Sequence, residues 1–114
     1  MLPRQNRLRK KEDVDRVFRR GRPVSGGLVM IKHLGSDSDS ATPRVAVLVG
    51  KKLEKKAVHR NRIKRRLREV IRLHVDQLPA GRDLLIVARS SKIRDISWEK
   101  LVEDTLSLLS KISN

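Results

Sequence analysis

The segment 51–68 holds the densest cluster of positively charged side chains in the sequence. Ten of the eighteen residues in KKLEKKAVHRNRIKRRLR are Lys or Arg, and only Glu54 is acidic. A solvated helix face usually interleaves both signs of charge, so this composition favours a polyanionic partner. Arginine suits that role because its planar guanidinium can bond a phosphate twice and can also stack on a base.

No comparable pattern predicts catalysis by side chains. His33, His59 and His74 do not have the spacing of metal ligands, no serine lies in a nucleophile elbow, and the carboxylates form no convincing pair. Asp37 and Asp39 alternate with serine, which is typical of a solubilising loop. The chain has no cysteine, which excludes a disulfide, a thiol nucleophile and a thiolate zinc site. We therefore assign no catalytic residue.

The overall charge points to the same class of partner. The net charge is +15 and the isoelectric point is near 11.4, so RNA, DNA or an anionic membrane is the expected partner. No stretch approaches the roughly 20 apolar residues that span a bilayer, and no apolar signal-peptide run follows the basic N-terminus. We expect a cytoplasmic protein. A membrane-surface role is disfavoured, because the basic helix is followed by a buried strand that needs a sheet around it.

A chain of 114 residues is expected to form one domain. Hydrophobic periodicity, caps and turn residues predict the elements in order. They are a helix at 11–20, an ambiguous extended piece at 22–25, strands at 28–34 and 44–49, a helix at 57–78, a strand at 83–88 and a helix at 97–112. The two strands at 28–34 and 44–49 are expected to pair as an antiparallel hairpin around a flexible loop at 35–43.

Two of these elements should form much of the core. The unbroken apolar run in 83–88 is typical of a strand covered on both sides. In the helix at 57–78, Ile63, Leu67 and Val70 share one face, so the basic residues between them should point outward. Ser97 is a candidate cap for the last helix, in which we interpret Trp98 as a core anchor.

A specific resemblance lies in the basic helix. Arg60-Asn61-Arg62-Ile63-Lys64-Arg65 followed by Arg68 resembles the RNR signature of the bacterial ribonuclease P protein family. The similarity extends along nearly the whole chain. Further matching motifs, in chain order, are Asn6-Arg7-Leu8, Glu12-Asp13, Val17-Phe18, Arg44-Val45, Lys51-Lys52 and the segment 83–89.

The resemblance implies a single α+β domain over residues 1–114. Its elements would follow the order αβββαβα around a four-stranded sheet, as in a ribosomal protein domain and a translocation-factor domain, with 22–25 as a short first strand. It also implies a left-handed βαβ crossover, against the usual right-handed preference.

The resemblance implies a protein subunit of ribonuclease P, which removes the 5′ leader of precursor tRNA by endonucleolytic cleavage. Its partners would be the catalytic RNA and precursor tRNA, with no stable protein partner. Magnesium ions held mainly by the RNA and the substrate would activate the attacking water. The implied RNA-binding residues are Lys51, Lys52, Arg60, Asn61, Arg62, Lys64, Arg65 and Arg68.

The implied leader cleft lies between the first helix and the sheet, at Val14, Phe18, Lys32 and Arg44. The family often has aromatic residues where this chain has Val14 and Lys32, so the cleft should depend more on charge and shape. Phe18 is the retained ring, with a plain core role as the alternative. Asn61 likewise has an alternative role, in which it only caps or orders the start of its helix.

Two other functions remain open from the sequence. One is a ribosomal or general RNA chaperone that uses the same basic helix without a leader cleft. The other is a protein-only nuclease, for which the chain offers no carboxylate set. Both are distinguished from a ribonuclease P subunit by the RNA that co-purifies and by the activity of RNA-free protein.

Overall fold

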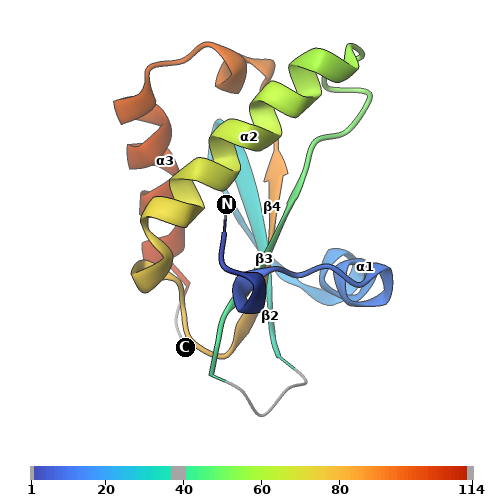
Figure 1. The fold of residues 1–114 in the computed structure, drawn as a ribbon, viewed down its shortest axis with the longest axis vertical. Helices are drawn as coiled ribbons and strands as arrows, with labels where there is room; N and C mark the ends of the chain where they lie inside the picture. The colour runs from blue at the N-terminus through green and yellow to red at the C-terminus, as the bar shows by residue number, and fades with distance from the viewer. Residues whose placement is uncertain (1, 37–40, 113–114) are drawn as a thin grey trace.

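The computed structural model describes residues 2–36 and 41–112. Three α-helices surround one four-stranded sheet (Figure 1). The elements are α1 (Lys11–Arg20), β1 (Arg22–Ser25), β2 (Val29–Gly35), β3 (Arg44–Leu48), α2 (Ala57–Leu73), β4 (Arg82–Ala88) and α3 (Trp98–Ser110). Three short 3-10 helices complete the chain: η1 (Arg4–Asn6), η2 (Val75–Gln77) and η3 (Ser91–Arg94). The predicted order αβββαβα is confirmed.

The strand order is β1-β2-β4-β3, which corrects the predicted hairpin. β2 and β3 do not pair with each other, because β4 lies between them, antiparallel to β2 and parallel to β3. The physical reason is the composition of β4. Leu84, Leu85 and Ile86 are fully buried. A strand with such a run is best placed in the centre of the sheet, where both of its faces are covered by other elements. Of the predicted loop at 35–43, residues 37–40 lie outside the described part of the chain.

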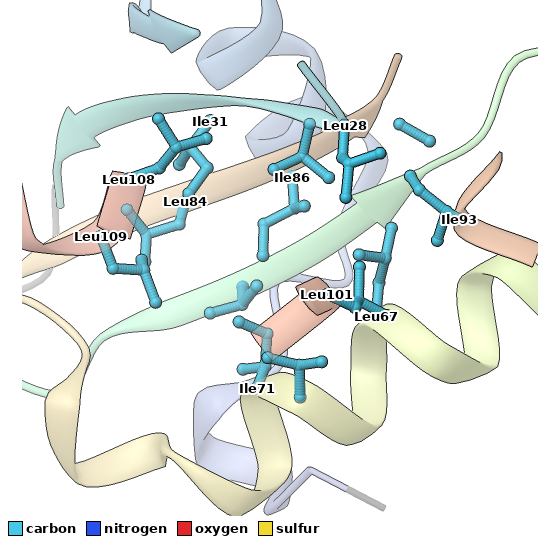
Figure 2. Packing of buried hydrophobic residues seen from close by; sticks show 14 of the residues in the cluster. Leu28, Ile31, Leu67, Ile71, Leu84, Ile86, Ile93, Leu101, Leu108 and Leu109 are labelled. Atoms are coloured by element: carbon cyan, nitrogen blue, oxygen red, sulfur yellow. The ribbon is translucent and has the colours of Figure 1, made fainter. Parts of the chain in front are cut away.

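The two faces of the sheet carry different layers. α2 and α3 cover one face, where Ile31, Leu84 and Ile86 meet Leu67, Leu101 and other residues of the main core (Figure 2). α1 packs on the other face through Val17, which contacts a smaller cluster around Leu85. β4 therefore contributes alternate residues to two separate cores.

α2 connects the parallel neighbours β3 and β4, as the family resemblance implies. The left hand of this crossover stays a prediction. The helix is shorter than the predicted range 57–78, because His74 leaves helical geometry and η2 carries the chain on. The chain then turns into β4 at Gly81, whose φ of +71° favours glycine. No helix in the described ranges 2–36 and 41–112 is long and apolar enough to cross a membrane.

Candidate RNA interface

The basic face of α2 is positioned by its apolar face. Ile63, Leu67 and Val70 are fully buried against the sheet and α3. The 3.6-residue period then directs the intervening side chains outward, and Arg65 and Arg68 are exposed. Packing of a few aliphatic residues thus determines where the cations lie.

The eight predicted RNA-binding residues fall into two groups. Arg60 and Arg62 are bonded within the protein. Within residues 2–36 and 41–112, the other six side chains have no intramolecular hydrogen bond or ion pair. They are Lys51, Lys52, Asn61, Lys64, Arg65 and Arg68. Five of these carry a positive charge that no carboxylate of the described chain neutralises.

Asn61 does not cap α2, so this alternative is wrong. The helix begins at Ala57, its N-cap is Lys56, and no side chain bonds the first turn. Asn61 is exposed on the second turn, one residue from each of the flanking arginines. Its amide is available to a partner.

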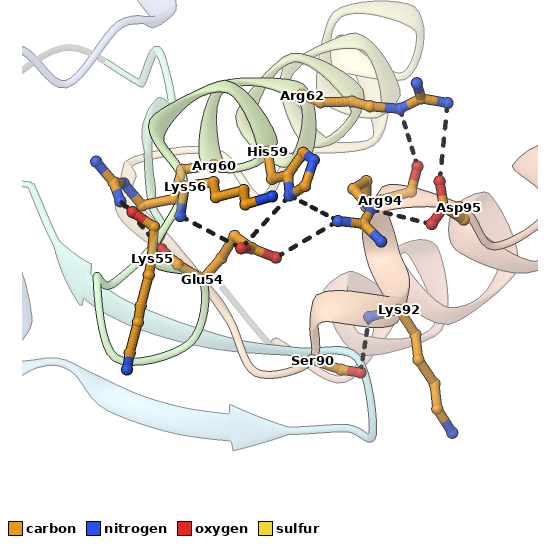
Figure 3. Close-up of polar contacts among 10 residues, drawn as sticks. All are labelled: Glu54, Lys55, Lys56, His59, Arg60, Arg62, Ser90, Lys92, Arg94 and Asp95. Carbon is orange, nitrogen blue, oxygen red and sulfur yellow. Dashed lines mark hydrogen bonds and ion pairs between the residues drawn. The ribbon is translucent and has the colours of Figure 1, made fainter.

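Three arginines of α2 hold neighbouring backbone in place, and Figure 3 shows two of them, Arg60 and Arg62. Arg60 Nη1 donates to the carbonyl oxygens of Glu54 and Lys55 at 3.0 and 2.7 Å. Arg62 Nε donates to the Arg94 carbonyl at 3.1 Å, and Arg66 Nη1 to the Ile93 carbonyl at 2.6 Å. These bonds fix the turn before α2 and the helix η3 beside it. The carbonyls are neutral, so these bonds leave the charges in place. Only Arg62 of the three also has an ion pair, with Asp95 Oδ1 at 4.0 Å from its Nη2, among the described residues 2–36 and 41–112.

Two carboxylates in this region, Glu54 and Asp95, are already engaged by the protein. Glu54 lies 3.5 Å from His59 Nδ1 and 3.7 Å from Arg94 Nη1, and Arg94 also approaches His59 Nδ1 at 2.7 Å (Figure 3). Its partial desolvation opposes ionisation, but the Lys56 backbone N–H, His59 and Arg94 together lower the pKa of Glu54. A hydrogen bond from Arg94 likewise lowers the pKa of Asp95. Both side chains therefore act as anions that hold cations in position.

The second candidate surface lies on α1 and the face of the sheet that it covers. Phe18 is 45% exposed, so its alternative role as a core residue is wrong. Lys32 of β2 places its ammonium 4.2 Å from the ring centroid and donates to the Phe18 carbonyl at 2.7 Å. Val14, one turn earlier, is half-buried and packs on the small cluster with Val17 and Leu85. The ring and its cation are the parts of this surface that a ligand can reach.

Arg44 is held in place by hydrogen bonds to a buried carboxylate. Its Nε and Nη2 both donate to the Asp83 carboxylate at 2.8 Å, and Asp83 also accepts from Arg16 at 3.1 Å. Asp83 is fully buried, and its hydrogen bonds raise the pKa of Arg44. The assignment of Arg44 to leader binding therefore remains a prediction, while its position fixes α1 against the sheet.

A groove of about 550 Å³ joins the two surfaces. It lies along the edge of β3, where Arg7 and Val45 form an isolated parallel bridge and the Leu8 N–H donates to the Val45 carbonyl at 2.9 Å. Its lining combines apolar residues with arginines. Among them are Val14, Ala46 and Leu48, and Arg9, Arg65 and Arg68.

Sequence reasoning missed two parts of this arrangement. Arg7 and Arg9 line the groove, yet the sequence offers no sign that the N-terminal segment would lie beside β3. The role of Asp83 could have been found, because a carboxylate at the start of an otherwise apolar strand requires a partner.

Comparison with known proteins agrees with this geometry. The ribonuclease P family model matches residues 2–113. The chain belongs to the ribonuclease P protein family. A ribonuclease P protein component from Pseudanabaena is 35% identical over 111 residues, which cover 97% of this chain and 94% of that protein. One from Dictyoglomus thermophilum is 36% identical and covers 96% and 90% of the two chains.

Solved ribonuclease P proteins also have this fold. The Thermotoga maritima protein superposes with a TM-score of 0.81 at 26% identity, over 95% of this chain and 98% of that one. The Staphylococcus aureus protein gives 0.77 at 25% identity, over 96% and 98%. The present chain is thus a ribonuclease P protein subunit, with a role in tRNA processing.

Proposed function

We propose that this subunit binds the catalytic RNA of ribonuclease P through α2 and the preceding turn, and holds the 5′ leader of precursor tRNA at Phe18 and Lys32. The observation that carries the proposal is the division of α2. A buried aliphatic face holds the helix on the sheet, and free cations such as Arg65 and Arg68 occupy the other face. Cations presented in this way neutralise phosphates and release counterions.

The leader site follows from Phe18 and Lys32. A half-exposed ring provides a platform for one unpaired base, and an ammonium over the ring is available to the adjoining phosphate. The groove along β3 continues from Val14 toward Arg65, so it connects the leader site with the surface assigned to the catalytic RNA.

The carboxylates within residues 2–36 and 41–112 do not suit a magnesium site. The described residues contain no group of three or more His, Asp or Glu side chains that could hold a metal ion. Asp83 and Glu54 are engaged by arginines. We therefore assign Mg²⁺ to the RNA and the substrate phosphates, and derive no step of the protein through it. The protein neutralises phosphate charge and positions the RNA and the substrate. We expect it to act in the cytoplasm.

Reconstitution with the ribonuclease P RNA encoded in the same genome tests the proposal. The mixture is expected to cleave precursor tRNA at the 5′ end of the mature sequence at low magnesium, where the RNA alone is slow. Cleavage by rigorously RNA-free protein would instead establish a protein nuclease. Recovery of ribosomal RNA alone, when the protein is purified from its own cell at moderate salt, would favour a ribosomal or chaperone role.

A further inference from the structure

Trp98 is the only tryptophan of the chain and lies at the first position of α3. It packs against the main core, which confirms its predicted anchor role, but it is only partly buried. The ring also lines an open hollow of about 440 Å³ between α3 and α2. The other residues of the hollow are Arg62, Arg65, Arg66 and Glu69.

The arginines of this hollow are held in different ways. Arg62 and Arg66 are held by the Arg94 and Ile93 carbonyls of η3, so little side-chain entropy remains to be lost when they bind a ligand. Arg65 is exposed and has no intramolecular partner within residues 2–36 and 41–112. The hollow therefore combines two fixed cations with one free cation.

The single carboxylate of the hollow does not oppose an anion strongly. Glu69 pairs with Arg72 one turn later on α2, and the hydrogen bond from Arg72 lowers the pKa of Glu69. The pair is neutral as a unit. Arg62 also lies 4.0 Å from the exposed Asp95, so the charge of the hollow that has no carboxylate partner in the described chain comes from Arg65 and Arg66.

The tryptophan side of this hollow lies apart from the leader surface, although Arg65 and Glu69 line both the hollow and the groove along β3. Trp98 belongs to the layer of α2 and α3, whereas Phe18 belongs to α1 on the opposite face of the sheet. The two aromatic residues of the chain are thus placed on opposite sides of the sheet. A single short strand bound at Phe18 would have to go round the sheet edge to reach Trp98.

We propose that the hollow binds one unpaired nucleotide of the catalytic RNA, with its base stacked on Trp98 and its phosphate held by Arg65 and Arg62. This inference rests on the proposed function, because α2 is the surface assigned to that RNA. An aromatic wall among arginines fits a flipped-out nucleotide, since the ring offers a face to any base and the guanidinium groups offer forks to its phosphate. A base inside a duplex could not present its face there.

Fluorescence of the unmodified protein tests this directly, because the chain has one tryptophan and no tyrosine. Emission excited at a wavelength that nucleotides barely absorb is measured during titration with the ribonuclease P RNA of the same genome. Saturating RNA is expected to quench Trp98 and to protect it from acrylamide. A ten-nucleotide leader oligonucleotide at its own saturation is expected to do neither.

Variants separate stacking from packing. Trp98→Leu should weaken binding of the catalytic RNA about 5- to 150-fold, the range for loss of one stacked base, and Trp98→Phe should weaken it less. Arg65→Gln should also weaken binding. Lys111→Gln, an exposed charge at the other end of α3, is the matched control and should lose less affinity than Arg65→Gln. Thermal melts accompany each variant.

The outcomes distinguish this inference from the proposed function. If the RNA binds but Trp98 stays unquenched and open to acrylamide, the ring only packs in the core and the inference is wrong. Protection by the leader oligonucleotide would also overturn it. If the RNA does not bind the parent protein at all, the proposed function itself fails.

Discussion

At the scale of single residues, Phe18 and Asp83 both depart from the usual rule that apolar side chains are buried and charged side chains are exposed. The apolar ring lies outside the core with a lysine over it, while the carboxylate is fully buried between two arginines. Stacking on the ring and pairing with the carboxylate can each be tested by one substitution.

Phe18→Ala should weaken binding of precursor tRNA relative to mature tRNA by about 1 to 3 kcal/mol, the worth of one stacked base. Assembly with the catalytic RNA should be nearly unchanged. Because the ring is half-exposed, the melting temperature should fall much less than for a core Phe→Ala change, which costs about 3 to 5 kcal/mol. If the variant folds and binds both tRNAs as the parent does, the ring does not stack on the leader, and the leader site must lie at Lys32 and its neighbours.

Asp83→Asn should destabilise the protein by about 3 kcal/mol, because it leaves Arg44 and Arg16 facing a buried neutral group. Urea denaturation measures this loss. Asp104→Asn on α3, whose ion pair with Lys100 is partly exposed, is the control and should change stability by less than about 1 kcal/mol. Equal losses of unfolding free energy in the two variants would show that the buried Asp83 pair stabilises the protein no more than an exposed ion pair does.

At the scale of elements, α2 serves two purposes at once. Its arginines face a partner, and some of them also bond the carbonyls of η3. A substitution on this helix can therefore act on RNA binding alone or on RNA binding and local structure together.

Arg65→Ala and Arg62→Ala should both weaken assembly with the catalytic RNA, without discriminating between substrates with and without a leader. Each lost phosphate contact should make the slope of log affinity against log salt shallower by about 0.9 or less. Only Arg62→Ala should also lower the melting temperature, since it removes the bond to the Arg94 carbonyl. A leader-dependent effect of Arg65→Ala would instead place the leader in the β3 groove.

His33 gives the sheet a pH dependence. Burial, with Arg82 and Arg22 nearby, lowers the pKa of His33 below its ordinary value of 6.5. The unfolded chain then binds a proton that the folded chain resists, so stability from this group is present above pH 6.5 and is lost as pH falls through the lower folded value.

His33→Gln should flatten this dependence. Melting temperatures of parent and variant between pH 8 and about 5.5 provide the test, in a range where carboxylates titrate little. The parent is expected to lose more stability than the variant toward the acid end. Parallel curves would mean that His33 is hydrated in the folded protein.

At the scale of the whole molecule, the net charge of +15 opposes compaction. Five cations of α2 and the preceding turn, which have no intramolecular partner in the described part of the chain, concentrate part of this charge on one surface. Sulfate, phosphate or a short oligonucleotide should therefore raise the melting temperature, because each binds the folded protein preferentially. The free protein should be only partly ordered at low ionic strength. A melting temperature that no anion shifts would argue against a preformed phosphate-binding surface.

The sequence alone determined the elements and the family. Local signals are strong where periodicity and caps agree, so α1 has the predicted bounds and Ser97 caps α3 by accepting a bond from the Lys100 N–H at 3.2 Å. The exposed face of α2 followed from its aliphatic period, and the signature around Asn61 led to the family that the comparisons establish.

Tertiary structure alone decided how these parts meet. Strand pairing depends on which strand is covered on both faces, so β4 separates β2 from β3 although those two are neighbours in sequence. The environments of Phe18 and Trp98 depend on the layer that each helix joins, which helical periodicity does not encode. The partners of Arg44 and Arg62 come from residues at least 30 positions away, such as Asp83 and Arg94, and only folding brings those charges and carbonyls within bonding distance.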